Sequence, residues 1–312
     1  MAEQCDGANY RILLVDDEPE IREMIFDFLT DLEGYTVCSA KNGMEALELL
    51  EKRTFDLVLS DINMPGIKGF ELLKRVREMY PTVKRVLITA YNVEEYLELA
   101  MKHDIGNIFV KTAPFNFNEL STLLRNLLLG DIFGIKRYFS EGTPVRKFTI
   151  SRSTKLDQDA KTIVEVINDE KRQKRIELVL IELLTNAIFY GARNEAPDCK
   201  DRWDHSFELT EDTAVVVKVA SDQEKYIISV KDKGGRLKKK DVLYWLNRQI
   251  ALDDTGIPLG LLDSHGRGLF IARRYIDRLV INIDKQKQTE VVMINYYNST
   301  YNGHKPLYIN EI

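Results

Sequence analysis

Residues 176–192 read IELVLIELLTNAIFYGA, and this stretch decides the fold of the second half of the chain. Its apolar residues recur with the 3.6-residue period of a helix that lies in a core. Glu182 and Asn186 stand four apart in its middle and so share one face. A carboxylate and an amide inside an apolar helix are costly unless they meet partners or a ligand. The helix alone is equally consistent with a ligand site and with a polar edge at its margin.

The composition predicts a water-soluble protein of two domains. The chain has 312 residues, of which 44% are hydrophobic, and its net charge is -5. This charge argues against a nucleic-acid-binding protein, which normally carries a basic domain. No apolar run approaches the roughly 20 residues that span a membrane. The cysteines lack metal-ligand spacing and no signal peptide is visible, so we expect reduced thiols in a cytoplasm.

The first half of the chain alternates short apolar runs with amphipathic segments. Five strands alternating with five helices predict a doubly wound parallel sheet. We expect the strands at residues 10–15, 35–39, 55–60, 83–89 and 107–110, and the helices at 20–32, 44–52, 69–79, 92–103 and 116–129.

Polar residues follow the carboxyl ends of these predicted strands, where such folds bind their ligands. They are Asp16, Asp17, Asp61, Thr89 and Lys111. Three carboxylates in one pocket repel each other strongly. A hard cation with oxygen ligands relieves that repulsion, and Mg²⁺ suits carboxylates and water. One acid at a strand end means little, but three acids with a hydroxyl and a lysine indicate a site.

Residues 9–130 resemble the receiver domain of two-component response regulators, through these five residues and the NMPG run at 63–66. The resemblance implies a flavodoxin-like fold in which Asp61 accepts a phosphoryl group from a phosphohistidine. It implies that Thr89 and Lys111 bind this phosphoryl group. An upstream histidine kinase or phosphotransfer protein would be the donor.

The same resemblance implies a Mg²⁺ site formed by Asp16, Asp17, Asp61 and the backbone carbonyl of Asn63. The chain departs from the receiver pattern at two places. The usual Lys-Pro is replaced by KTAP at 111–114, and Ile108 stands at the position of the usual switch aromatic residue. The phosphorylation chemistry is expected to be intact, whereas the usual route from threonine to aromatic residue is in doubt.

The predicted organisation has four parts: a receiver at 1–130, a packed linker at 131–145, a second domain at 146–297 and a C-terminal tail at 298–312. Ile132, Phe133 and Ile135 are too apolar for a flexible tether, so we expect the junction 131–139 to couple the domains. The tail is aromatic and polar; packing against the domain is favoured over partner binding.

The second domain predicts an α/β sandwich with a mixed sheet, because hairpins of strands alternate with helices. We expect strands at 148–151, 214–220, 226–230, 280–283 and 290–295, and helices at 155–167, 176–192, 241–250 and 269–279. The HGRG turn at 265–268 opens the last helix, and a glycine-rich turn at a helix start can bind a phosphate.

Residues 146–297 resemble the GHKL, or Bergerat-fold, ATPases. Glu182 and Asn186 match the N box, and the resemblance implies that Asn186 holds Mg²⁺ on ATP while Glu182 acts as general base. The resemblance also implies further contacts with ATP. Asp232 and Gly234 match the first glycine box, near the adenine, and Thr289 would also lie near the adenine. The second glycine box, under the phosphates, is matched by Gly266, Arg267 and Gly268. Arg236 replaces the last glycine of the first box, and Tyr190 stands where a histidine is common.

Within this superfamily, ELLTNAIFYG and HGRGLFIARRYID resemble the anti-sigma-factor serine kinases. The region between His103 and His205 contains no histidine, so the phosphorylatable helix of a sensor kinase is missing there. We expect a bacterial, cytoplasmic response regulator whose output domain phosphorylates serine or threonine on an anti-sigma-factor antagonist. An ATP-dependent module that sequesters an antagonist or a sigma factor, and a histidine kinase acting in trans, stay open. A homodimer is compatible with both resemblances.

Overall fold

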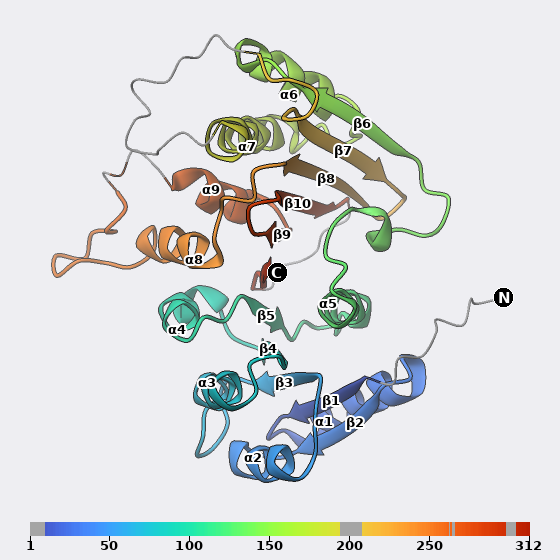
Figure 1. The fold of residues 1–312 in the computed structure, drawn as a ribbon, viewed down its shortest axis with the longest axis vertical. Helices are drawn as coiled ribbons and strands as arrows, with labels where there is room; N and C mark the ends of the chain where they lie inside the picture. The colour runs from blue at the N-terminus through green and yellow to red at the C-terminus, as the bar shows by residue number, and fades with distance from the viewer. Residues whose placement is uncertain (1–9, 194–207, 262, 264–265, 298–303) are drawn as a thin grey trace. The chain divides into compact units, whose positions relative to one another are not determined.

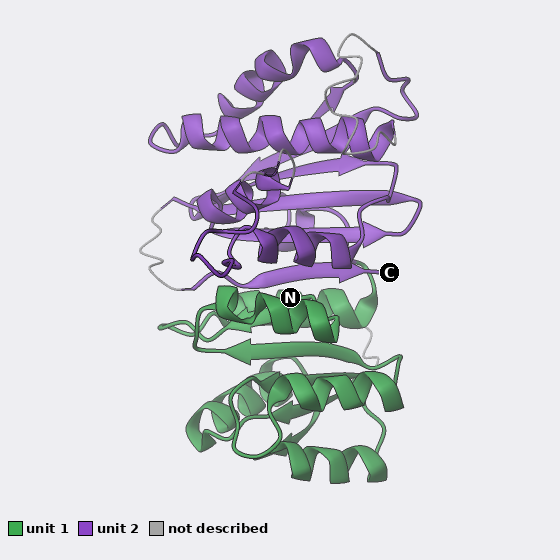
Figure 2. Cartoon of the chain, turned by 90° about the vertical axis from the view of Figure 1, so that its left-hand side faces the viewer, with its two compact units in different colours: residues 1–131 green, residues 132–312 purple. Residues whose placement is uncertain are grey.

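The computed structural model describes residues 10–193, 208–261, 263, 266–297 and 304–312. These residues form two compact units, Met1–Asp131 and Ile132–Ile312, which Figure 2 distinguishes by colour. Most of the polar loop expected at 193–212, the histidine of the HGRG turn, and the first part of the predicted tail lie outside the described residues. No helix in the described ranges is long and apolar enough to cross a membrane.

The first unit is a parallel sheet with the strand order β2-β1-β3-β4-β5 (Figure 1), which confirms the predicted doubly wound fold. Strands β1, β3, β4 and β5 are mostly buried, as expected for a sheet covered on both faces, whereas β2 at the edge buries only Ala40. The elements are β1 (Arg11–Val15), α1 (Pro19–Asp27), β2 (Thr36–Ala40), α2 (Gly43–Lys52), β3 (Leu57–Asp61), α3 (Gly69–Met79), β4 (Lys84–Thr89), α4 (Leu97–His103), β5 (Asn107–Val110) and α5 (Phe117–Leu129).

Side-chain caps fix where the helices of this unit begin. Asn42 accepts a hydrogen bond from Glu45 N at the start of α2, and Asn116 accepts one from Glu119 N at the start of α5. The Glu119 side chain in turn accepts from Asn116 Nδ2. Helix α5 ends at Leu129 and is capped by Gly130, whose φ of 68° is left-handed and therefore suits glycine. The residues at these caps therefore set where the helices begin and end, and with them where the strands that they connect end.

The second unit is a mixed sheet with the strand order β11-β9-β10-β8-β7-β6, which confirms the predicted sandwich class. All its strand pairs are antiparallel except β11 with β9. Figure 1 shows the helices gathered beside this sheet. The elements are β6 (Val145–Ile150), α6 (Leu156–Val164), α7 (Gln173–Asn186), β7 (Val215–Ser221), β8 (Lys225–Asp232), α8 (Lys239–Arg248), α9 (Arg267–Tyr275), β9 (Arg278–Asp284), β10 (Gln288–Tyr296) and β11 (Leu307–Glu311).

Strand β11 was not predicted from the sequence. The preceding Lys305 donates from Nζ to the carbonyls of Arg273 and Arg274 at the end of α9, at 2.9 and 2.6 Å. Arg273 donates back to the carbonyls of Lys305 and Pro306. At the other end, Glu311 Oε1 accepts from Lys239 N, 3.0 Å away, at the start of α8. The tail therefore joins two helices as well as extending the sheet.

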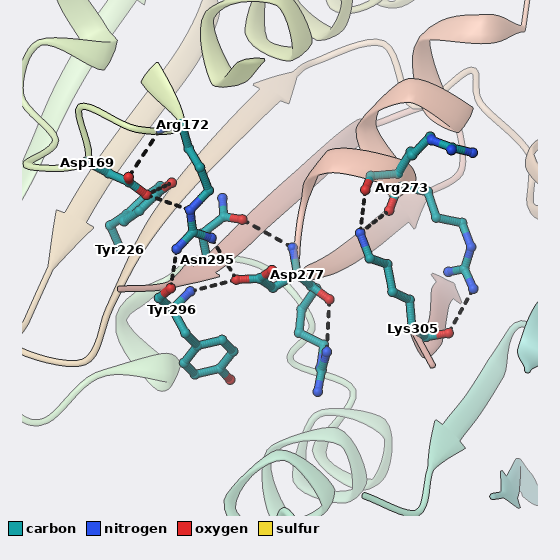
Figure 3. A network of polar contacts seen from close by, with 10 residues as sticks. Asp169, Arg172, Tyr226, Arg273, Asp277, Asn295, Tyr296 and Lys305 are labelled. Atoms are coloured by element: carbon teal, nitrogen blue, oxygen red, sulfur yellow. Dashed lines mark hydrogen bonds and ion pairs between the residues drawn. The ribbon is translucent and has the colours of Figure 1, made fainter. Parts of the chain in front are cut away.

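A half-buried ion-pair network holds the turn before α7 against the sheet (Figure 3). Arg172 Nε lies 2.8 Å from Asp169 Oδ2, and its Nη1 lies 3.0 Å from Asp277 Oδ2. Tyr226 donates its hydroxyl to the same Asp169 oxygen at 3.0 Å. Burial, with the charge of Asp169, raises the pKa of Tyr226. One guanidinium therefore neutralises two carboxylates that come from different parts of the unit.

We expect Arg172→Ala to lower the free energy of unfolding of the second unit by about 2–4 kcal/mol, because two largely buried carboxylates lose their shared cation. Thermal and urea unfolding of the purified chain measure this change. The control is Lys52→Ala, which removes a solvent-exposed ion pair with Glu48 and should change stability by less than about 0.5 kcal/mol. Equal effects of the two substitutions would contradict a structural role for the network.

Candidate phosphorylation pocket and nucleotide site

The polar residues of the first unit gather where its strand order reverses, between β1 and β3. Asp16 follows β1, Asp61 ends β3, and Lys111 follows β5. The two carboxylates meet at the Lys111 ammonium, whose Nζ lies 2.8 Å from Asp61 Oδ1 and 2.9 Å from Asp16 Oδ2. A reversal of strand order opens a crevice at the carboxyl ends of the strands. The fold therefore brings together three of the residues expected in the pocket.

Lys111 also pairs with Glu18 Oε1, 3.1 Å from Nζ, a partner that the sequence did not indicate. Burial opposes the charge of Lys111, but hydrogen bonds to Asp61 and Asp16 outweigh that effect and raise its pKa. The lysine therefore stays charged at neutral pH. It is placed to attract an anionic group that approaches the Asp61 carboxylate.

Asp16 is fully buried, and burial raises the pKa of its carboxyl. Its Oδ2 atom pairs with Lys111 but accepts no well-directed hydrogen bond. An additional cation would relieve this burial cost, and carboxylate oxygens suit Mg²⁺. Asp17 is half-buried beside it. Within the described residues, however, no group of three or more His, Cys, Asp or Glu side chains is arranged to hold a metal, so the full ligand set stays a prediction.

Asn63 and Thr89 complete the surroundings of Asp61. Asn63 N donates to Asp61 Oδ2 at 2.6 Å, and its side-chain amide donates to the hydroxyl of Tyr96 at 2.7 Å. Thr89 ends β4 and is 1% exposed, and its hydroxyl accepts from Tyr91 N at 3.0 Å. Asp61 Oδ1 and Oδ2 are therefore already oriented, by the lysine and by a backbone N–H.

In the second unit, Gly268 lies directly against the two polar residues of α7. A Cβ atom at position 268 would lie 3.0 Å from Glu182 Oε2 and 3.3 Å from Asn186 Nδ2. A substituent there would crowd both side chains. Gly268 follows Asn186 by 82 residues in the sequence, yet the two positions lie together at the start of α9. Backbone N–H groups at a helix start can bind an anion.

A π-helical turn, Ala187–Ala192, continues α7 and carries Gly191 to the sheet. A Cβ at Gly191 would lie 2.4 Å from Asp232 Cγ, and one at Gly234 would lie 2.0 Å from the carbonyl oxygen of Gly191. The wider π turn changes which residues face the sheet, and such turns occur frequently at functional sites. The sequence indicated a continuous helix but not this change of winding.

Asp232 and Thr289 are direct neighbours across β8 and β10. Both are buried, and Asp232 Oδ1 accepts from Gly234 N at 2.8 Å and from Gly235 N at 3.3 Å. Burial raises the pKa of Asp232 to about 6. A buried carboxylate whose second oxygen can accept from a ligand amino group is the chemistry expected at an adenine pocket.

The start of α9 is closed on one side by α8. Gly266 has a φ of 77°, and a Cβ there would lie 2.4 Å from a ring atom of Trp245 on α8. Arg267 donates from Nη2 to the carbonyl of Leu261, so its guanidinium is turned toward the loop between the helices. Two of the residues expected beneath the phosphates thus differ. Gly268 faces the polar side of α7, whereas the Arg267 guanidinium binds the backbone carbonyl of Leu261.

Tyr190 lies on the π turn, close enough to Glu182 for the charge of that carboxylate to act on its hydroxyl. Burial, and then the Glu182 carboxylate, raise the pKa of the Tyr190 hydroxyl to about 12. The hydroxyl therefore keeps its proton at neutral pH. A neutral, proton-donating group thus replaces the histidine expected at this place in the ATPase pattern.

The two units have the folds of a receiver and of an ATPase-like α/β domain, in that order along the chain. Residues 12–125 match the response regulator receiver domain, and residues 158–295 match the histidine kinase-like ATPase domain. The chain belongs to the response regulators and carries a histidine kinase-like ATPase domain after its receiver.

Similar proteins match part of the chain. The chain is 31% identical over 120 residues to sporulation initiation phosphotransferase F of Bacillus subtilis, covering 38% of this chain and 94% of that protein. It is 27% identical over 187 residues to the probable transcriptional regulator ycf29 of Pyropia yezoensis, covering 59% and 82%. The crystal structure of the response regulator TrrA from Thermotoga maritima with Mg²⁺ and BeF is 40% identical, covers 38% of this chain and 99% of that one, and has a TM-score of 0.35.

We expect Asp232→Asn to stabilise the ligand-free protein, and increasingly so as the pH rises. The pKa of Asp232 is raised from 3.8 to about 6, so folding favours the protonated acid. The stability that Asp232 removes therefore grows as the pH rises from 3.8 and is complete above 6. The asparagine keeps an oxygen that can accept from Gly234 N.

The stability difference between Asp232→Asn and the parent chain should increase by about 1 kcal/mol between pH 5 and pH 8. Thermal unfolding at the two pH values, without nucleotide, measures it. A difference that is independent of pH, or that shrinks toward pH 8, would show that the Asp232 carboxylate is not disfavoured by burial.

Proposed function

We propose that phosphorylation of Asp61 controls an ATP-binding output domain that acts as a serine/threonine protein kinase in a partner-switching pathway. The proposed setting is a bacterial cytoplasm. The proposed donor is a histidine kinase or phosphotransfer protein, and the proposed substrate is an anti-sigma-factor antagonist. The observation that carries the enzymatic half is the close approach of Gly268 to Glu182 and Asn186, whose side-chain atoms would lie 3.0 and 3.3 Å from a Cβ at position 268.

The pocket around Asp61 supports the phosphorylation half. The Asp61 oxygen would attack the phosphorus of a phosphohistidine, the bond from phosphorus to the histidine nitrogen would break, and Lys111 would balance the added charge. Thr89 would donate its hydroxyl to a phosphoryl oxygen. Mg²⁺, held by Asp16, Asp17, Asp61 and the carbonyl of Asn63, would shield the phosphoryl oxygens.

The face of α7 supports the kinase half. Glu182 would accept the proton of a substrate serine or threonine hydroxyl as that oxygen attacks the terminal phosphorus of ATP, and the bond from this phosphorus to the bridging oxygen would break to release ADP. Asn186 would orient the phosphates, with Mg²⁺ bound to them, against the backbone at Gly268. Asp232 and Thr289 would hold the adenine, with Gly234 and Gly266 keeping the backbone close to the nucleotide.

A second candidate is an ATP-dependent binding module with little turnover. Arg236 favours it, because this charged residue follows Gly235 where a further glycine is expected, and its charge acts on Asp232. In that case the loaded domain would sequester an antagonist or a sigma factor. The two candidates share the ATP site and differ in whether Glu182 is used.

The kinase assay mixes the full chain with labelled Mg·ATP and candidate antagonists. We expect label on serine or threonine, reduced at least about a hundredfold by Glu182→Gln because the general base is lost. Asn186→Ala should remove both label and ATP affinity. Glu177→Gln is the matched control, because it lies five residues earlier on α7 and away from Gly268. A tight ATP-dependent complex without label would support sequestration, and label on histidine would support a kinase acting in trans.

For the receiver half, we expect Asp61→Asn to abolish acid-labile phosphorylation by a small-molecule phosphodonor, because the amide is not a nucleophile. Asp31→Asn, on an exposed helical turn, should be phosphorylated normally. Phosphate incorporation followed by intact mass measures both. Label retained in Asp61→Asn would place the acceptor elsewhere.

A further inference from the structure

The segment that follows the receiver, Ile132–Ile135, binds the sheet of the second unit on the face opposite the nucleotide site. Side chains alternate between the two faces of a strand. Asp232 and Thr289 face Gly191 and α7, so their strand neighbours Lys231 and Glu290 face the other way. The linker contacts these outward-facing neighbours.

Directed hydrogen bonds hold this linker segment. Gly134 N donates to Glu290 Oε2 at 2.6 Å, and Asn282 Nδ2 donates to the carbonyl of Ile132 at 2.6 Å. Asn310 on β11 in turn donates to Asn282 Oδ1 at 2.8 Å. Glu290, Asn282 and Asn310 are each at most 3% exposed. The contact is thus a buried polar one, not a surface association.

Apolar and aromatic groups add to these bonds. Ile132 and Ile135 are each 1% exposed, and Lys231 Nζ lies 5.3 Å from the centre of the Phe133 ring. Gly134 has a φ of 92°, a conformation that side chains rarely adopt. The backbone therefore turns at Gly134 so that its N–H meets Glu290.

The strand register places these contacts directly behind the adenine pair. Glu290 pairs with Lys231 on β8 and with Asn282 on β9. Thr289 and Asp232, one residue along each strand, form the pair on the opposite face. A shift or twist of β10 at Glu290 therefore moves Thr289 as well, because adjacent residues share one backbone.

We propose that this linker clasp, formed by Ile132–Ile135 with Glu290 and Asn282, transmits the state of the receiver to the adenine pocket. Only Gly130 and Asp131 lie between the end of α5 at Leu129 and Ile132, so the clasp is at most roughly 10 Å of chain from that helix. The inference rests on the proposed function and specifies its route of regulation.

Glu290 depends on the clasp for its hydrogen bond. Its Oε2 atom is bonded to Gly134, while its Oε1 atom has no hydrogen-bond partner and is buried. If the linker is pulled away, neither carboxylate oxygen keeps a partner, which is unfavourable in a buried position. The side chain and β10 must then rearrange, and the adenine pair moves with them.

The test measures Mg·ATP affinity of the full chain with and without beryllium fluoride, which mimics a phosphoryl group on aspartate. We expect the parent chain to change its dissociation constant roughly fivefold or more on treatment, as is typical of coupled sites. In Glu290→Ala and in Asn282→Ala the change should fall below about twofold. Glu290→Gln, which keeps an oxygen for Gly134 N, should retain most of the response.

Ser229→Ala is the matched control. Ser229 is on the same face of β8 as Lys231, is fully buried, and its hydroxyl has no partner, so its loss should leave the response unchanged. Thermal unfolding verifies that each variant is folded, and if Glu290→Ala is not, Asn282→Ala carries the comparison. Full responses in folded clasp variants would overturn the inference and leave the proposed function standing. Failure of the parent chain to bind ATP would refute the proposed function itself.

Discussion

The close approach of α7 to its neighbours is the constraint on which the second unit depends. Its polar side chains lie close to the start of α9, where a Cβ at position 268 would be 3.0 Å from Glu182 Oε2 and 3.3 Å from Asn186 Nδ2. The π turn then reaches Asp232 only because position 191 has no side chain. At both positions backbone approaches a polar side chain closely, and an added Cβ would require that side chain to shift. The glycines thus set the dimensions of the site, and the carboxylates and the amide supply its chemistry.

The sequence was sufficient wherever function depends on local pattern. The parallel strands of the receiver, the helix α7 and the start of α9 follow from apolar period and glycine placement, and the structure has them within a few residues of the predicted bounds. The joining of Asp61 and Lys111 follows from parallel strands ending at one edge. The convergence of Glu182, Asn186 and Gly268 was inferred from a resemblance to known ATPases, and the geometry gives it a physical basis.

The sequence was insufficient wherever structure depends on distant pairing. Strand β11 has only a short apolar pattern, and it forms a strand because it pairs in parallel with β9, which is distant in the sequence. The role of Glu290 is equally hidden, because a carboxylate in a strand pattern normally indicates a solvent-facing position, whereas here the linker covers it. The sequence did not indicate that Glu18 belongs to the pocket, because its partner Lys111 lies 93 residues away along the chain.

Strand β11 also has a consequence for the order in which the chain acquires its structure. Residues leave the ribosome from the N-terminus, so the receiver is available to fold long before the second unit is complete. Helices α8 and α9 receive their contacts from Glu311 and Lys305 only when the final residues of this sequence have emerged. Until then β9 has an unpaired edge, which can associate with other strands. The second unit is thus incomplete until residues 305–311 have been made, and its sheet has an open edge at β9 up to that point.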